Sequence, residues 1–137
     1  YYSASGAPAQ EGYEQVDFET LLTQSDIISV HAPLNEHTEG LINSKAFEKM
    51  KSSCIFLNLG RGPIVDEQAL YNALVRNQIA AAGLDVLCKE PMSADNPLLK
   101  IKDSKRLLIT PHIAWASVEA RTHLMEIIHG QVKDFFA

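Results

Sequence analysis

The chain has 137 residues, and 12 Lys and Arg against 17 Asp and Glu give a net charge of −5 with neutral histidines. Apolar residues make up 46% and charged residues 21%, which is the balance of a globular protein with a hydrophobic core. The acidic charge argues against nucleic acid or an anionic membrane as partner, because basic surfaces bind both. No apolar run approaches the ~18 residues that a membrane span needs.

The predicted elements alternate between helix and strand along the chain. In chain order they are a helix capped by Asp17, a strand at 27–30, a helix capped by Ser44, a strand at 54–57, a helix capped by Asp66, strands at 80–86 and 107–110, and a final helix capped by Ser117. Each strand is a continuous apolar run, which is typical of parallel strands buried on both faces. Strands that alternate with helices indicate βαβ units and therefore an α/β fold with a parallel sheet.

The cysteines indicate which cellular compartment and which kind of metal site to expect. The only two cysteines, Cys54 and Cys88, are far apart in the sequence and match neither a disulfide framework nor a zinc motif. We therefore expect a reduced, cytoplasmic setting and no metal.

Polar and glycine-rich residues follow each predicted strand, where open parallel sheets bind their ligands. Arg61 stands between two glycines, so its guanidinium either holds a carboxylate by two hydrogen bonds or is a solvated side chain in a surface turn. His112 follows the last strand and is suited to general acid–base work, or it is structural. Glu90, in the long loop at 88–106, either pairs with His112 and favours its charged form or is a solvated charge.

Asp85 ends an otherwise apolar strand, where an unpaired carboxylate is costly to bury. A cofactor amide or ribose is one candidate partner. A helix N-terminus or a nearby backbone amide is the other.

Taken in order, four segments resemble the cofactor-binding domain of the D-isomer-specific 2-hydroxyacid dehydrogenases over Ser25 through Arg121. They are HAPLNEHTEGLIN at 31–43, FLNLGRGPIVDEQALYNAL at 56–74, AAGLDVLCKEP at 81–91 and ITPHIAWAS at 109–117. The AWAS version of the last segment is most similar to glycerate dehydrogenases, also called hydroxypyruvate reductases.

The resemblance implies hydride transfer between a nicotinamide cofactor and C2 of a small 2-hydroxy or 2-oxo acid, with hydroxypyruvate, glyoxylate and D-glycerate as the expected substrates. Arg61 would grip the substrate, His112 would be the acid/base, and Glu90 would orient it. The implied cofactor contacts are Ala32, Pro33, Leu59, Gly60, Arg61, Asp85, His112 and Trp115. The implied cofactor is NAD, with NADP left open, and the implied assembly is a homodimer.

The family's G-x-G-x-x-G turn is absent from the sequence. We therefore expect residues 1–137 to be a partial dinucleotide-binding domain of the Rossmann type, without the first βα unit or the substrate domain, and inactive alone. We also expect the strands at 27–30 and 54–57 to lack a neighbour that belongs between them. The alternative function is a corepressor-like interaction protein that senses NAD(H) on the same fold.

Overall fold

The computed structural model of the chain describes residues 1–136. Its elements are α1 (Phe18–Gln24), β1 (Ile27–Val30), α2 (Ser44–Lys49), β2 (Ile55–Asn58), the 3-10 helix η1 (Gly62–Ile64), α3 (Glu67–Val75), β3 (Ala81–Leu84), the 3-10 helix η2 (Pro97–Lys100), β4 (Leu107–Ile109) and α4 (Val118–Phe135). All four predicted strands are therefore present, within one or two residues of their expected bounds. Among residues 1–136, no helix combines the length and the apolar character needed to cross a membrane.

Three of the four predicted N-caps are confirmed. Asp17, Asp66 and Ser117 each accept a hydrogen bond from the backbone N–H three residues on. The prediction for Ser44 is wrong, because Ser44 is already helical and Asn43 is the last extended residue. The Asn43 amide oxygen accepts from the N–H groups two and three residues further along the chain.

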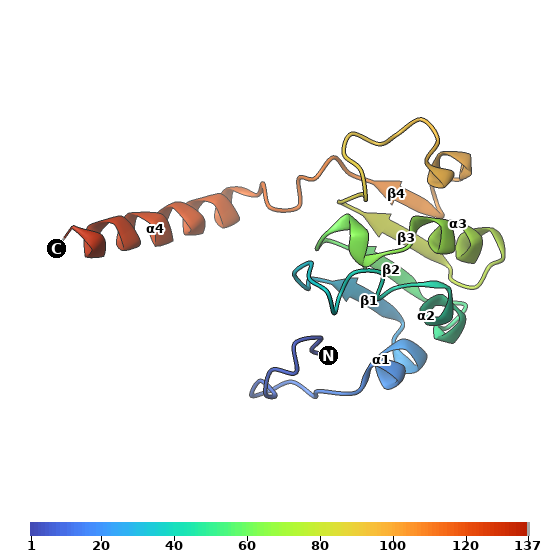
Figure 1. The fold of residues 1–137 in the computed structure, drawn as a ribbon, viewed down its shortest axis with the longest axis horizontal. Coiled ribbons are helices and arrows are strands. Elements are labelled where there is room, and N and C mark those ends of the chain that lie inside the picture. The colour runs from blue at the N-terminus through green and yellow to red at the C-terminus, as the bar shows by residue number, and fades with distance from the viewer. Residues whose placement is uncertain (137) are drawn as a thin grey trace.

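The four strands form one parallel sheet in the order β1-β2-β3-β4, as Figure 1 shows. Ile27 is paired with Ile55, and Ile55 is paired with Ala81. The expectation that the first two strands lack a neighbour between them is wrong, because β1 and β2 hydrogen-bond to each other directly. The prediction of a parallel α/β sheet of the Rossmann type is confirmed.

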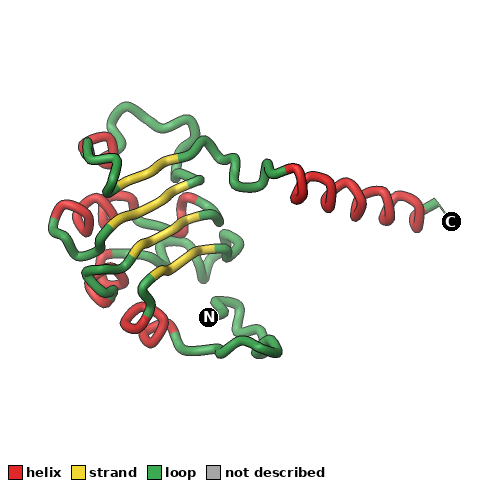
Figure 2. Tube along the Cα trace, turned by 180° about the vertical axis from the view of Figure 1, so that it is seen from behind, coloured by secondary structure: helices red, strands yellow, loops and turns green. Residues whose placement is uncertain are grey.

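Helices α1, α2 and α3 all lie on one face of the sheet. Figure 2 is seen from the opposite face, with the strands in front of these helices. Under the helices, fully buried residues such as Phe47, Phe56 and Leu70 form the core. Alternate strand residues point to the other face, where Ile27 and Leu108 are 61% and 63% exposed. The prediction that the strands are buried on both faces is therefore wrong for the described part of the chain.

The final helix, α4, projects away from the sheet in both views. None of its residues is buried, although it carries apolar residues at helical spacing. The sheet and helices α1 to α3 therefore make the core without it, and the segment between β4 and α4 leaves the edge of the sheet where the strands end.

Candidate active site

The carboxyl ends of the four strands meet at one edge of the sheet, because the strands are parallel. The segments that follow them are 31–34, 59–61, 85–92 and 110–115. They contain every residue that the sequence singled out as a site residue, so these residues gather at one edge.

Arg61 is presented by a turn that the end of β2 holds in place. The buried Asn58 amide donates to the Arg61 carbonyl at 3.0 Å, and its oxygen accepts from the Gly60 N–H at 3.1 Å. A Cβ on Gly60 would lie 3.0 Å from the Ala32 carbonyl oxygen, so the turn after β2 packs closely on the segment after β1. Arg61 is exposed, and its guanidinium donates through Nη1 to the Gly60 carbonyl at 2.9 Å.

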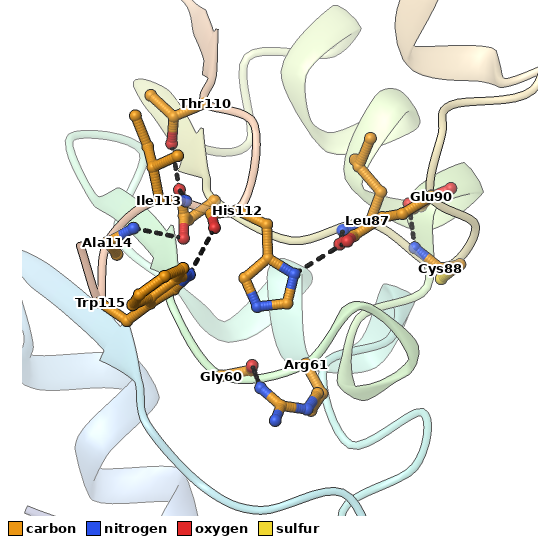
Figure 3. Close-up of polar contacts among 12 residues, drawn as sticks. Gly60, Arg61, Leu87, Cys88, Glu90, Thr110, His112, Ile113, Ala114 and Trp115 are labelled. Carbon is orange, nitrogen blue, oxygen red and sulfur yellow. Dashed lines mark hydrogen bonds and ion pairs between the residues drawn. The ribbon is translucent and has the colours of Figure 1, made fainter. Parts of the chain in front are cut away.

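Glu90 and His112 are in contact. The His112 Nδ1 lies 2.8 Å from Glu90 Oε2, and Glu90 Oε1 accepts from the Leu87 N–H at 2.9 Å. The Leu87 N–H and then the His112 ring hold the pKa of Glu90 below its usual range, so the carboxylate is charged and accepts a hydrogen bond from His112 Nδ1–H. In Figure 3 the other ring nitrogen of His112 points to the side where the Arg61 guanidinium lies.

The backbone at His112 is left-handed, with φ 56°, a region that few non-glycine residues adopt. Its N–H donates to the carbonyl oxygens of Asp85 at 2.9 Å and Thr110 at 3.0 Å. The Trp115 indole N–H donates to the His112 carbonyl at 2.8 Å. These contacts hold the histidine in an uncommon backbone conformation, a pattern that clusters at functional sites.

Asp85 binds the segment that carries His112. The residue is 4% exposed. Its Oδ1 accepts from Thr110 Oγ1 at 2.6 Å and the Ile113 N–H at 2.9 Å, and its Oδ2 accepts from the Ala114 N–H at 2.8 Å. Burial opposes its charge, but the hydrogen bonds from Thr110, Ala114 and Ile113 outweigh burial and hold the pKa of Asp85 below its usual value. Of the two partners that the sequence left open, the structure shows backbone amides, and the predicted cofactor contact of Asp85 stays a prediction.

Replacing Asp85 by Asn should lower the free energy of unfolding at pH 7 by about 1–3 kcal/mol, because an amide NH₂ cannot accept the bonds that a carboxylate oxygen accepts. Since the folded pKa of Asp85 lies below its ordinary 3.8, the charged form adds stability above pH 3.8 that is lost as the pH falls through the folded pKa. The variant should therefore lose less stability than the parent on acidification. Urea denaturation at a series of pH values checks this, with the exposed Asp134→Asn as control; equal acid sensitivity of parent and Asp85→Asn would contradict it.

Two hollows divide the predicted site residues between them. One, of about 470 Å³, is lined by His31, Ala32, Pro33, Leu34, Leu59, Gly60 and Arg61. The other, of about 680 Å³, is lined by Asp85, Leu87, Glu90, Pro91, Met92, Ile109, Thr110, Pro111 and His112. Trp115 lines neither of these and stands 59% exposed beside the start of α4.

Sequence reasoning missed three residues that shape this edge: Asn58, Thr110 and Glu67. Asn58 holds the turn of Arg61, and Thr110 binds Asp85. Glu67 accepts from the Cys88 N–H at 2.8 Å, at the start of the loop that carries Glu90. Asn58 and Thr110 each end an apolar run, and that position was a usable signal; nothing in the sequence marks Glu67.

Comparison with known proteins gives a consistent family. The model of the NAD binding domain of D-isomer specific 2-hydroxyacid dehydrogenases matches residues 1–114. The hydroxypyruvate reductase of Blautia hydrogenotrophica is 45% identical over 136 residues, which covers 98% of this chain and 41% of that protein. The chain thus spans less than half the length of this curated relative.

Two solved structures have the same fold. An acyclic imino acid reductase in complex with NADPH and D-Arg matches with a TM-score of 0.84 and 36% identity, covering 98% of this chain and 42% of that one. The D-lactate dehydrogenase from Lactobacillus jensenii with NAD⁺ matches with a TM-score of 0.78 and 36% identity, covering 92% and 41%. The chain belongs to the D-isomer specific 2-hydroxyacid dehydrogenase family and matches the NAD-binding domain of that family.

Proposed function

We propose that this chain forms part of the dinucleotide-binding domain of an oxidoreductase that transfers a hydride between NAD(H) and C2 of a small D-2-hydroxy or 2-oxo acid. The observation that carries the proposal is the contact between Glu90 and His112, at the sheet edge that also presents Arg61. In this proposal residues 1–137 supply these three side chains, and the substrate domain lies outside them.

The cleft after β1 and β2 suits a nicotinamide cofactor. Its volume of about 470 Å³ lies in the range of small-molecule sites, and its walls combine apolar residues with the polar side chains of His31 and Arg61. Gly60 packs closely on the Ala32 carbonyl, so the turn after β2 and the segment after β1 form adjoining walls of this cleft. Ala32, Pro33, Leu59 and Gly60 would hold the cofactor, which would supply or accept the hydride when bound.

The side chains of this chain divide the remaining work. Arg61 binds the substrate carboxylate, since a guanidinium offers two parallel N–H groups to such a group. The charged His112 donates the Nε2 proton to the C2 oxygen in the reduction, and the neutral ring takes that proton back in the oxidation. Glu90 accepts from Nδ1, which orients the ring with Nε2 towards the substrate and stabilises its charged form.

Hydroxypyruvate, glyoxylate and D-glycerate are the substrates we propose. The similarity to a hydroxypyruvate reductase supports them, as does the AWAS sequence after His112. We further propose NAD as the working cofactor, with NADP left open, a homodimeric assembly and a cytoplasmic setting.

The test is a kinetic assay of the protein, expressed with whatever sequence flanks residues 1–137 in its gene. Hydroxypyruvate, glyoxylate and pyruvate are each offered with NADH and with NADPH, and absorbance at the nicotinamide band follows turnover. We expect turnover of hydroxypyruvate or glyoxylate with NADH, and little from residues 1–137 alone. No turnover of any of these acids, together with oligomerisation that depends on NAD(H), would refute the proposal in favour of the cofactor-sensing alternative.

A further inference from the structure

Glu67 joins two distant parts of the site edge. It is the half-buried first residue of α3, and its two carboxylate oxygens accept from two different points of one loop. Oε1 accepts from the Cys88 N–H at 2.8 Å, and Oε2 accepts from the Asn96 side-chain amide at 2.8 Å. Asn96 is 6% exposed and in turn caps η2 by accepting from the Leu98 N–H.

Glu67 is hydrogen-bonded to Cys88 and Asn96, and the loop that contains these two residues also contains Glu90. Glu90 also accepts a hydrogen bond from the Leu87 N–H. The carboxylate that contacts His112 therefore also holds Leu87, the residue before Cys88. On the other side, Glu67 lies three residues after the end of η1 and six residues after Arg61 in the chain. The contact of Glu67 thus ties the segment that presents Arg61 to the loop that presents Glu90.

Helix capping does not account for this carboxylate. Asp66 is the N-cap of α3 and accepts from the Ala69 N–H. The Glu67 carboxylate instead accepts hydrogen bonds from outside the helix. Both groups that reach Glu67 are donors, and a carboxylate offers two acceptor oxygens where an amide offers one. The side chain therefore fits a bridge between two donors of one loop.

We propose that Glu67 is a positioning residue, whose bridge to Cys88 and Asn96 holds Glu90 against His112 and keeps both in place relative to Arg61. This inference rests on the proposed function. Glu67 touches neither substrate nor cofactor in this account and acts through Glu90. A small displacement of a catalytic group is enough to cost a large part of the rate.

The first test is a double-mutant cycle of Glu67→Gln and Glu90→Gln in the protein with its native flanks. At assay temperatures well below the melting temperature of the variant, we expect Glu67→Gln to lower kcat about ten- to a hundredfold. It should displace the pH profile of kcat in the same direction as Glu90→Gln. The double variant should be no slower than Glu90→Gln alone, because the bridge acts through Glu90. Multiplicative effects of the two substitutions would overturn the proposal, as would an unchanged kcat.

The second test reverses the donor and acceptor of the bridge. In Glu67→Gln with Asn96→Asp, the new amide donates to the new carboxylate, which can still accept from the Leu98 N–H. We expect the double variant to regain most of the kcat that either single variant loses. Glu48→Gln, the same change at an exposed position of α2, is the control and should match the parent. Failure of the reversed pair to recover kcat, with the fold intact by circular dichroism, would overturn the proposal.

A readout without turnover separates this proposal from the proposed function. Burial and the Glu67 carboxylate raise the pKa of the Cys88 thiol to about 11. Glu67→Gln should therefore speed alkylation of Cys88 by iodoacetamide and speed amide exchange at Leu87 and Cys88. An inactive parent refutes the proposed function, whereas an active parent whose Glu67→Gln variant leaves alkylation and exchange unchanged refutes only the bridge.

Discussion

Replacing His112 by Asn is expected to lower kcat for hydroxypyruvate by about 10²- to 10⁴-fold, the usual contribution of a general acid–base group. Asn is chosen because His112 has a φ of 56°, and Asn tolerates this left-handed conformation better than Ala does. Its side chain cannot exchange a proton near neutral pH, so the proton step is lost while the backbone is kept. Stopped-flow or steady-state assays with NADH measure the effect.

The stability of the variant is a necessary companion measurement. We expect the melting temperature of His112→Asn to stay near that of the parent, since the backbone contacts to Asp85 and Thr110 are kept. The matched control is His129→Asn on the exposed face of α4, which should leave kcat unchanged. Parental kcat in a folded His112→Asn protein would remove His112 from the proposed mechanism.

Most of the fold could be predicted from local patterns, and the errors come from contacts between distant residues. Apolar runs located the strands, although only one face of each strand is covered by helices in the described part of the chain. The same pattern does not reveal which strands are neighbours, and the pairing of Ile27 with Ile55 was not foreseen. It also does not show whether a helix covers the second face. The misplaced cap at Ser44 arose because Asn43 and Ser44 are both good N-caps, and only the backbone angles distinguish them.

The candidate site was predictable where one residue type at a strand end already suggests its chemistry. Arg61, Glu90 and His112 were found in this way and from the family resemblance, and the contact of Glu90 with His112 is present. Glu67 was not foreseen, because a glutamate in the first turn of a helix is ordinary in sequence. Its partner Asn96 lies 29 residues away, so the bridge exists only in the folded chain.

Replacing Gly62 by Ala is expected to disturb the fold next to the site. A Cβ on Gly62 would lie 2.0 Å from the carbonyl carbon and oxygen of Leu87 and 2.3 Å from the nitrogen of Cys88. All three are backbone atoms, so no side-chain rotation relieves the clash, and η1 must separate from the residues that precede Glu90. We expect the free energy of unfolding to fall by about 1–3 kcal/mol, the usual cost of overpacking, and kcat to fall in the molecules that remain folded.

Urea denaturation and assays below the transition measure the two effects separately. Gly130→Ala in α4 is the matched control, because a Cβ there meets nothing within 4 Å. That change should raise helix stability by about 0.5–1 kcal/mol, since alanine loses less backbone freedom than glycine. Because Gly62 and Glu67 both fasten the segment after Arg61 to residues 87 and 88, loss of either contact should speed amide exchange at Leu87. A Gly62→Ala protein with parental stability and parental exchange there would show that the two segments are not held together.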